Sequence, residues 1–197
     1  MIKLTIDNTE YLHPSKIEEV TLRQWIAIND IEEDTSLSHI ENNIKAFSAF
    51  SGVPVAKLST LPKKDLLYYI SITYEMVGKV DLTDNVPPKT FKVGRSTFIV
   101  NKNIDDCEVS QYLDSTHYMK LLESSPSFYP YMMAIYCLKK REKYNSGKYD
   151  MAKRVEQMLD ANVLDALKIN AFFLITSQDY QNDTRLYLAG NQAATKS

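Results

Sequence analysis

The sequence predicts an α+β protein that is predominantly α-helical, a helical bundle with a short N-terminal strand and one β-hairpin at about residues 89–101. Three observations lead to this class. Apolar residues recur at helical spacing along most of the chain, residues 2–6 alternate between apolar and polar side chains, and a Gly-Arg dipeptide joins two short β-prone runs. The 197 residues fit a single domain, expected over residues 1–190, followed by a flexible tail at 191–197.

The N-terminal strand over residues 2–6 is expected to lead into a loop through His13, and then into the clearest local signal in the chain. Thr21 is placed to cap a helix, and Gln24, three residues later, is placed to bond the backbone N–H of Thr21. This capping box predicts a helix that begins at Thr21 and runs to about Asn29.

Two further helices are predicted before residue 80. One spans about 37–51 and ends at Gly52, and the other begins at Pro62 and ends at Gly78. Proline fits a first helical turn because its missing N–H would have no partner there. The second of these helices is expected to bury one face, which consists of Leu66, Tyr69, Ile70, Thr73 and Val77.

A β-hairpin is predicted from strands at 90–93 and 96–100. The Gly94-Arg95 dipeptide between them is typical of a two-residue type II′ turn. This pairing places Phe91 opposite Phe98 on one face of the hairpin. A slip of one residue would separate the two rings, so the pattern predicts a single register.

Helices are also predicted for most of the remaining chain. A helix capped by Asp105 or Asp106 is expected to run to about residue 121. A strongly apolar helix is expected over about 128–143, and two helices that meet near residues 160–162 are expected over about 149–178. The buried side of the first of these helices is expected to contain Val109, Tyr112, Leu113 and Leu121.

Composition narrows the classes of partner. The 23 basic and 25 acidic side chains give a net charge of −2, whereas proteins that mainly bind nucleic acid carry a clear basic excess. Two cysteines are too few for a disulfide framework, and the first residues lack the pattern of a signal peptide. No apolar run approaches the ~20 residues that span a bilayer. We therefore expect synthesis in the cytoplasm and no membrane partner.

No pattern for metal or cofactor chemistry is recognisable. The three histidines have no metal-ligand spacing, and the five glycines form no nucleotide-binding fingerprint. The remaining catalytic hypothesis takes Cys107 as a nucleophile, with His117 as its base and Asp114 as the third group. Nothing in the sequence requires these residues to converge, and two ordinary small cysteines with a surface histidine account for them. We therefore assign no catalytic residue, cofactor or metal, and expect that the chain is not an enzyme.

A basic cluster late in the chain is the candidate nucleic-acid contact. Tyr144 and Tyr149 lie close to it in sequence and would suit stacking on bases. The negative net charge argues against this use, and basic residues in the last turn of a helix are also explained by the helix dipole. The candidate residues are Lys139, Lys140, Arg141 and Lys143.

Aromatic residues form the candidate protein interface. Large apolar surface rimmed by polar groups marks protein contacts. The chain holds 13 tyrosines and 7 phenylalanines, more aromatic material than one small core plainly needs. The candidate contact residues, on the hairpin and on the later helices, are Phe91, Phe98, Tyr131, Tyr136, Phe172 and Phe173.

The order of these motifs resembles virion and tail-assembly proteins of tailed bacteriophages. The segments that carry the resemblance are EVTLRQW at 19–25, SGVP at 51–54, LPKKDL at 61–66, DCEVSQYL at 106–113 and NAFFL at 170–174. The resemblance implies a non-enzymatic structural component of a tail, neck or baseplate, located in the virion. Its partners would be other phage structural proteins and copies of itself, as in a homo-oligomeric ring. Two alternatives stay open: a transient chaperone of tail assembly, and an accessory protein that contacts DNA.

Overall fold

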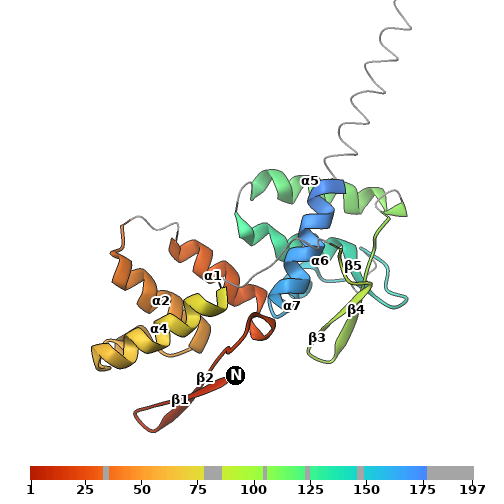
Figure 1. Cartoon of the computed structure of the whole chain (residues 1–197). Helices are drawn as coiled ribbons and strands as arrows, with labels where there is room; N and C mark the ends of the chain where they lie inside the picture. The colour runs from red at the N-terminus through yellow and green to blue at the C-terminus, as the bar shows by residue number, and fades with distance from the viewer. Residues whose placement is uncertain (33–35, 78–85, 104–105, 123–124, 146–148, 177–197) are drawn as a thin grey trace, which may run out of the picture.

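The computed structural model describes residues 1–32, 36–77, 86–103, 106–122, 125–145 and 149–176. The predicted class is confirmed, since the fold is α+β and mainly helical (Figure 1). The strands are β1 (Ile2–Ile6), β2 (Thr9–His13), β3 (Thr90–Val93), β4 (Ser96–Val100) and β5 (Cys137–Lys139). The helices are α1 (Leu22–Glu32), α2 (His39–Ser51), α3 (Val55–Leu58), α4 (Lys63–Val77), α5 (Val109–Leu121), α6 (Tyr129–Tyr136), α7 (Met151–Met158) and a last helix over 163–176.

The predicted N-terminal strand is confirmed as β1, but the expected loop after it is wrong over most of its length. Residues Thr9–His13 form β2, which pairs antiparallel with β1. Asp7 and Asn8 both have positive φ, at 49° and 59°, which is the backbone of a type I′ hairpin turn. Asp and Asn tolerate this conformation better than most residues, and this is why the chain can reverse there.

The predicted capping box is confirmed at the start of α1. The backbone N–H of Thr21 donates to Oε1 of Gln24 at 2.9 Å, and the N–H of Gln24 donates to the Thr21 hydroxyl at 3.3 Å. The helix continues past the expected end at Asn29, as far as Glu32. Helix α2 ends as predicted at Gly52, which has a φ of +69°. The predicted ends at Gly78 and residue 178 and the tail at 191–197 lie outside the described residues.

The predicted hairpin is confirmed in its register, with Phe91 paired to Phe98 and their ring centroids 5.4 Å apart. Of its two central residues, only Gly94 has positive φ, at 56°, as a type II′ turn requires. A third strand, β5, adds antiparallel to β4, so that Val100 pairs with Cys137. The sheet order is β3-β4-β5.

The helix expected over 128–143 is therefore wrong in its second half. The chain is helical only to Tyr136, and Cys137–Lys139 then leave the helix to pair with β4. Arg141 has a φ of +64°, which no right-handed helix contains. Pairing with β4 replaces the helical hydrogen bonds that this segment gives up, so tertiary contact decides the conformation.

The buried face predicted for α5 is also wrong. Val109, Leu113 and Leu121 are 75%, 60% and 64% exposed and Tyr112 is half-buried, whereas Gln111 and Ser115 are buried. The polar side chains turn inward because they hydrogen-bond α6: Nε2 of Gln111 donates to the carbonyl oxygen of Ile135 at 2.7 Å. The helix begins at Val109 after Glu108, and not after the predicted cap Asp106; Asp105 lies outside the described residues.

The remaining predictions for helices agree with the structure. In α4, Leu66, Ile70 and Thr73 of the predicted face are buried and Tyr69 is half-buried; the side chain of Val77 lies outside the described part of the chain. Helix α7 and the last helix meet near residues 160–162, and Thr21 forms an isolated antiparallel bridge with Asn162 at that junction. In Figure 1 the first hairpin, α2 and α4 lie on one side of α1, and the second sheet with α5, α6 and α7 lies on the other. No described helix is both long and apolar enough to cross a membrane.

Candidate binding groove beside strand β5

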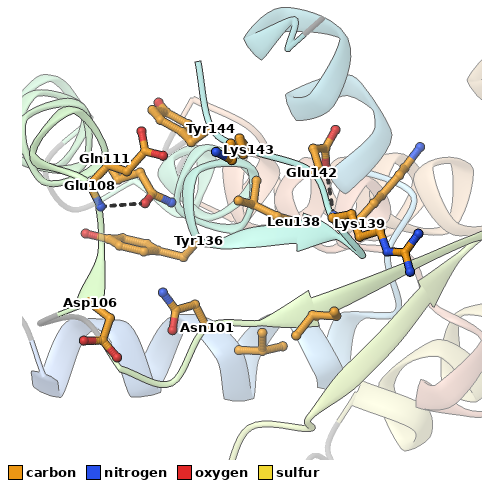
Figure 2. Close-up of a pocket in the computed structure, with 13 residues that line it drawn as sticks. Asn101, Asp106, Glu108, Gln111, Tyr136, Leu138, Lys139, Glu142, Lys143 and Tyr144 are labelled. Carbon is orange, nitrogen blue, oxygen red and sulfur yellow. Dashed lines mark hydrogen bonds between the residues drawn. The ribbon is translucent and has the colours of Figure 1, made fainter. Parts of the chain in front are cut away.

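An open groove of about 410 Å³ lies where the ends of β4 and β5, the start of α5 and the turn after β5 meet (Figure 2). Each of these segments is held in place by the fold described above, so the groove is assembled from parts that are distant in sequence. The residues that line it are Ile99, Val100, Asn101, Asp106, Glu108, Gln111, Tyr136, Leu138, Lys139, Arg141, Glu142, Lys143 and Tyr144.

The charged side chains around the groove are balanced. Three are basic, on β5 and the turn that follows it, and three are acidic, on the α5 side and in that turn. The lining also includes the apolar side chains of Ile99, which is 44% exposed, and Leu138, which is half-buried. The groove therefore offers a small apolar patch together with charges of both signs. The charged residues are Lys139, Arg141, Lys143, Asp106, Glu108 and Glu142.

Glu142 holds the turn after β5 against the sheet. Its Oε2 accepts a hydrogen bond from the backbone N–H of Lys139 at 2.8 Å, drawn in Figure 2, and its Oε1 accepts one from Nη2 of Arg154 at 2.5 Å. Burial favours the neutral acid, but the bonds from Arg154 and Lys139 outweigh it and keep the pKa of Glu142 below its usual value. The carboxylate thus stays charged and fixes the basic turn.

The wall formed by α5 is fixed by a network of hydrogen bonds. The N–H of Glu108 donates to Oε1 of Gln111 at 2.9 Å, as Figure 2 shows. The hydroxyl of Tyr136 donates to Oγ of Ser115 at 2.9 Å. Burial raises the pKa of Tyr136 although the hydrogen bond with Ser115 opposes the shift, so Tyr136 remains a neutral donor. This network makes the groove a preformed surface rather than a loose loop.

The candidate protein interface predicted from aromatic residues is mostly wrong. Phe91, Phe98, Tyr136 and Phe173 are at most 3% exposed and belong to one core cluster within the chain. They pack against one another there, with Tyr136 and Phe173 having ring centroids 4.6 Å apart, so they are not available to another protein. Tyr131 and Phe172 are half-buried; the ring of Tyr131 stacks on Tyr118 at 4.3 Å.

The structure brings the basic cluster to the groove. Lys139, Arg141 and Lys143 line it, and Lys140 is exposed but lies outside the lining. None of the four lies in a last helical turn, so the helix dipole does not explain the cluster. The acidic side chains of the same groove would repel a phosphate backbone, which weakens the nucleic-acid reading of these residues.

The residues of the catalytic hypothesis serve other purposes. Asp114 accepts a hydrogen bond from the hydroxyl of Tyr144 at 2.7 Å, and His117 is exposed with its ring edge against Tyr118. Cys107 is half-buried and packs beside the larger core cluster. Among the residues that the structure describes, no group of three or more His, Cys, Asp or Glu side chains could hold a metal ion.

Arg154 and Glu142 were not predicted from the sequence. They form an ion pair that holds the turn after β5. Arg154 is only 8% exposed, because helical spacing places it beside Met151 and Met158 on the inner face of α7. A charged residue at a position that helical spacing assigns to the core was the signal in the sequence, because a buried charge requires a partner. Glu142 is that partner.

Comparison with known proteins gives no further guide: no protein-family model, curated protein or solved structure matches this chain.

Proposed function

We propose that this protein is a non-enzymatic structural component of a tailed-phage particle and that it binds a neighbouring subunit through the groove beside β5. The observation that carries the proposal is the groove itself, which combines an exposed apolar side chain, Ile99, with fixed charges of both signs. A polypeptide segment that carries an apolar residue between an acidic and a basic one complements this lining. The assignment to a phage particle rests on the resemblance of the sequence to phage virion proteins.

A protein partner fits the groove better than nucleic acid does. A polyanion would gain contacts with Lys139, Arg141 and Lys143, but would also meet Asp106 and Glu108 on the other wall. Mixed charges favour a partner that presents both signs, and they also discourage wrong partners. The groove would give such a subunit a defined orientation on the particle.

The test is the protein content of finished particles. Mass spectrometry of purified particles of the phage that encodes this chain should find it at a fixed copy number. Particles made with Lys143→Glu should contain several-fold fewer copies, because the substitution reverses a charge in the groove lining. Lys140→Glu makes the same charge change outside the groove and should leave the copy number unchanged.

Three results would contradict this proposal. Absence of the chain from finished particles, together with its presence on assembly intermediates, would support the transient tail-assembly chaperone. Equal incorporation of Lys143→Glu and Lys140→Glu would show that the groove does not contact the neighbouring subunit. Retention of the purified protein on DNA at moderate salt, lost in Lys143→Glu, would favour the DNA-contacting accessory protein.

A further inference from the structure

Behind the groove, on the other side of Glu142, a buried guanidinium has an unused donor. Nη2 of Arg154 pairs with Glu142, and the guanidinium lies over the rings of Phe98 and Tyr149, at 4.9 and 5.4 Å from their centroids. The other terminal nitrogen, Nη1, is buried and meets no hydrogen-bond acceptor in the described part of the chain. A buried charged donor without an acceptor is unfavourable, and an acceptor that reached it would be held strongly.

Arg154 lines a small polar hollow of about 220 Å³ between the turn after β5 and the first turn of α7. Two acidic side chains in its wall already have partners: Glu142 binds Arg154 and the N–H of Lys139, and Asp150 accepts the N–H of Lys153 at 3.0 Å. Within the described ranges, no carboxylate pairs with the ammonium groups of Lys139 or Lys153. The remaining lining residue is Gln157.

The hollow thus collects three cations around a volume suited to one small ion. Lys139 approaches from β5, while Lys153 and Arg154 approach from α7. The ammonium of Lys139 also contacts the Phe98 ring, 5.5 Å from its centroid, so two like charges share one aromatic partner. An anion between them would reduce this repulsion and would satisfy Nη1 of Arg154.

We propose that this hollow binds a tetrahedral oxyanion of the phosphate class. The donors come from different sides, so several oxygen atoms spread in three dimensions match them better than the two oxygens of a planar carboxylate. Glu142 already occupies the side of the guanidinium that a carboxylate would pair with. Lys139 and Glu142 line both the hollow and the groove, but the phosphate proposal does not rest on the partner proposed for the groove.

The experiment measures thermal unfolding and isothermal titration of the full chain with inorganic phosphate, with chloride at equal ionic strength as the reference. Phosphate should raise the midpoint temperature in a saturable way, because a ligand that binds only the folded state stabilises it. Lys153→Gln, at an exposed position, should raise the Kd for phosphate at least several-fold. Lys140→Gln makes the same charge change outside the hollow and should bind phosphate as the wild type does.

A second variant tests the donor itself. Arg154→Lys keeps a positive charge but removes both Nη1 and the Nη2 that binds Glu142, so it should lose the phosphate effect. If circular dichroism shows that it does not fold, the Lys153→Gln comparison decides. No saturable binding by the wild type, or an equal loss in Lys153→Gln and Lys140→Gln, would overturn the proposal. An equal effect of acetate, or tighter binding of a DNA oligonucleotide than of phosphate, would also overturn it.

Discussion

At the scale of single residues, His13 shows how a buried polar group can tie two elements together. It is 1% exposed at the end of β2, where its ring stacks on Phe47 with centroids 4.9 Å apart. Its Nδ1 lies 2.5 Å from the carbonyl oxygen of Pro14, which can only accept, so Nδ1 carries the proton. Nε2 then accepts from the hydroxyl of Thr73 on α4 at 2.9 Å. The first hairpin is thereby fixed to α4.

The titration of His13 predicts how the stability of the protein depends on pH. Burial lowers the pKa of His13 below 6.5; the hydrogen bond to Pro14 opposes this shift, and the charged N-terminus adds to it. The folded state therefore prefers the neutral ring. The stability that this preference provides is present above pH 6.5, and it is lost as the pH falls through the lower pKa of folded His13. The free energy of unfolding should decrease between about pH 7 and pH 5.

Urea denaturation at a series of pH values measures this dependence. His13→Gln should be less stable than the wild type at pH 7, and its stability should change less between pH 7 and pH 5. His39→Gln is the matched control, because His39 is exposed at the first residue of α2 and its replacement should leave the wild-type curve in place. Parallel curves for the wild type and His13→Gln would show that His13 does not carry the pH dependence.

At the scale of elements, the hairpin β3–β4 depends on the contact between Phe91 and Phe98. Phe91→Leu and Phe98→Leu should each lower the free energy of unfolding by about 1 kcal/mol, because leucine keeps most of the buried apolar volume. The double variant should lose less than the sum, by about 0.5 to 1.5 kcal/mol, because either change alone removes the ring contact.

Chemical denaturation of the two single variants and the double variant measures this coupling. The control cycle combines Phe91→Leu with Phe47→Leu, whose side chain belongs to a different core cluster, and these losses should add. Additive losses for Phe91 and Phe98 would mean that the two rings do not support each other.

The elements predicted well from sequence are those whose signals are local. The hairpin with Gly94 and the capping box at Thr21 each depend on a few neighbouring residues. The turn of Asp7 and Asn8 was equally local, but the strand after it, Thr9–His13, does not alternate between apolar and polar side chains. Strand β5 is different, because Cys137 leaves the helix only when Val100 is there to pair with it. Periodicity within one segment does not contain that information.

The buried face of α5 and the groove were missed for a related reason. Helical spacing of apolar residues points to Val109 and Leu113. The inward side is set instead by two hydrogen bonds with α6, one that Gln111 donates and one that Ser115 accepts. The groove is lined by segments that are distant in sequence. The basic cluster could therefore be predicted from sequence, but the acidic residues that face it across the groove could not. The position of Arg154 on the inner face of α7 was the one feature of the sequence that indicated a buried ion pair near the groove.

At the scale of the whole molecule, the beginning and the end of the described chain are clasped together. The N–H of Leu22 donates to the carbonyl of Ala161 at 2.9 Å, and the N–H of Val163 donates to that of Val20 at 3.0 Å. Asn162 adds two bonds, from its Nδ2 to the carbonyl of Glu18 and from the N–H of Leu164 to its Oδ1. The bonds to Ala161, Val20 and Glu18 join segments about 140 residues apart, whereas the bond from Leu164 is a local cap of the last helix. The long-range bonds link the core cluster of the hairpin and α6 to the clusters of the N-terminal helices.

This clasp predicts that the chain unfolds as one cooperative unit, as expected for a single domain. Asn162→Ala should lower the free energy of unfolding by about 1 to 2 kcal/mol, because it removes both a helix cap and a bond to the other segment. The transition followed by fluorescence of Trp25, the only tryptophan, should coincide with that followed by far-UV circular dichroism. Asn103→Ala is the control. Asn103 is exposed, its side chain donates to Asp106, and its backbone N–H, which the substitution keeps, donates to Asn101, so stability should change little. A second step in the circular dichroism that is absent from the fluorescence would show that the two sides of α1 unfold independently.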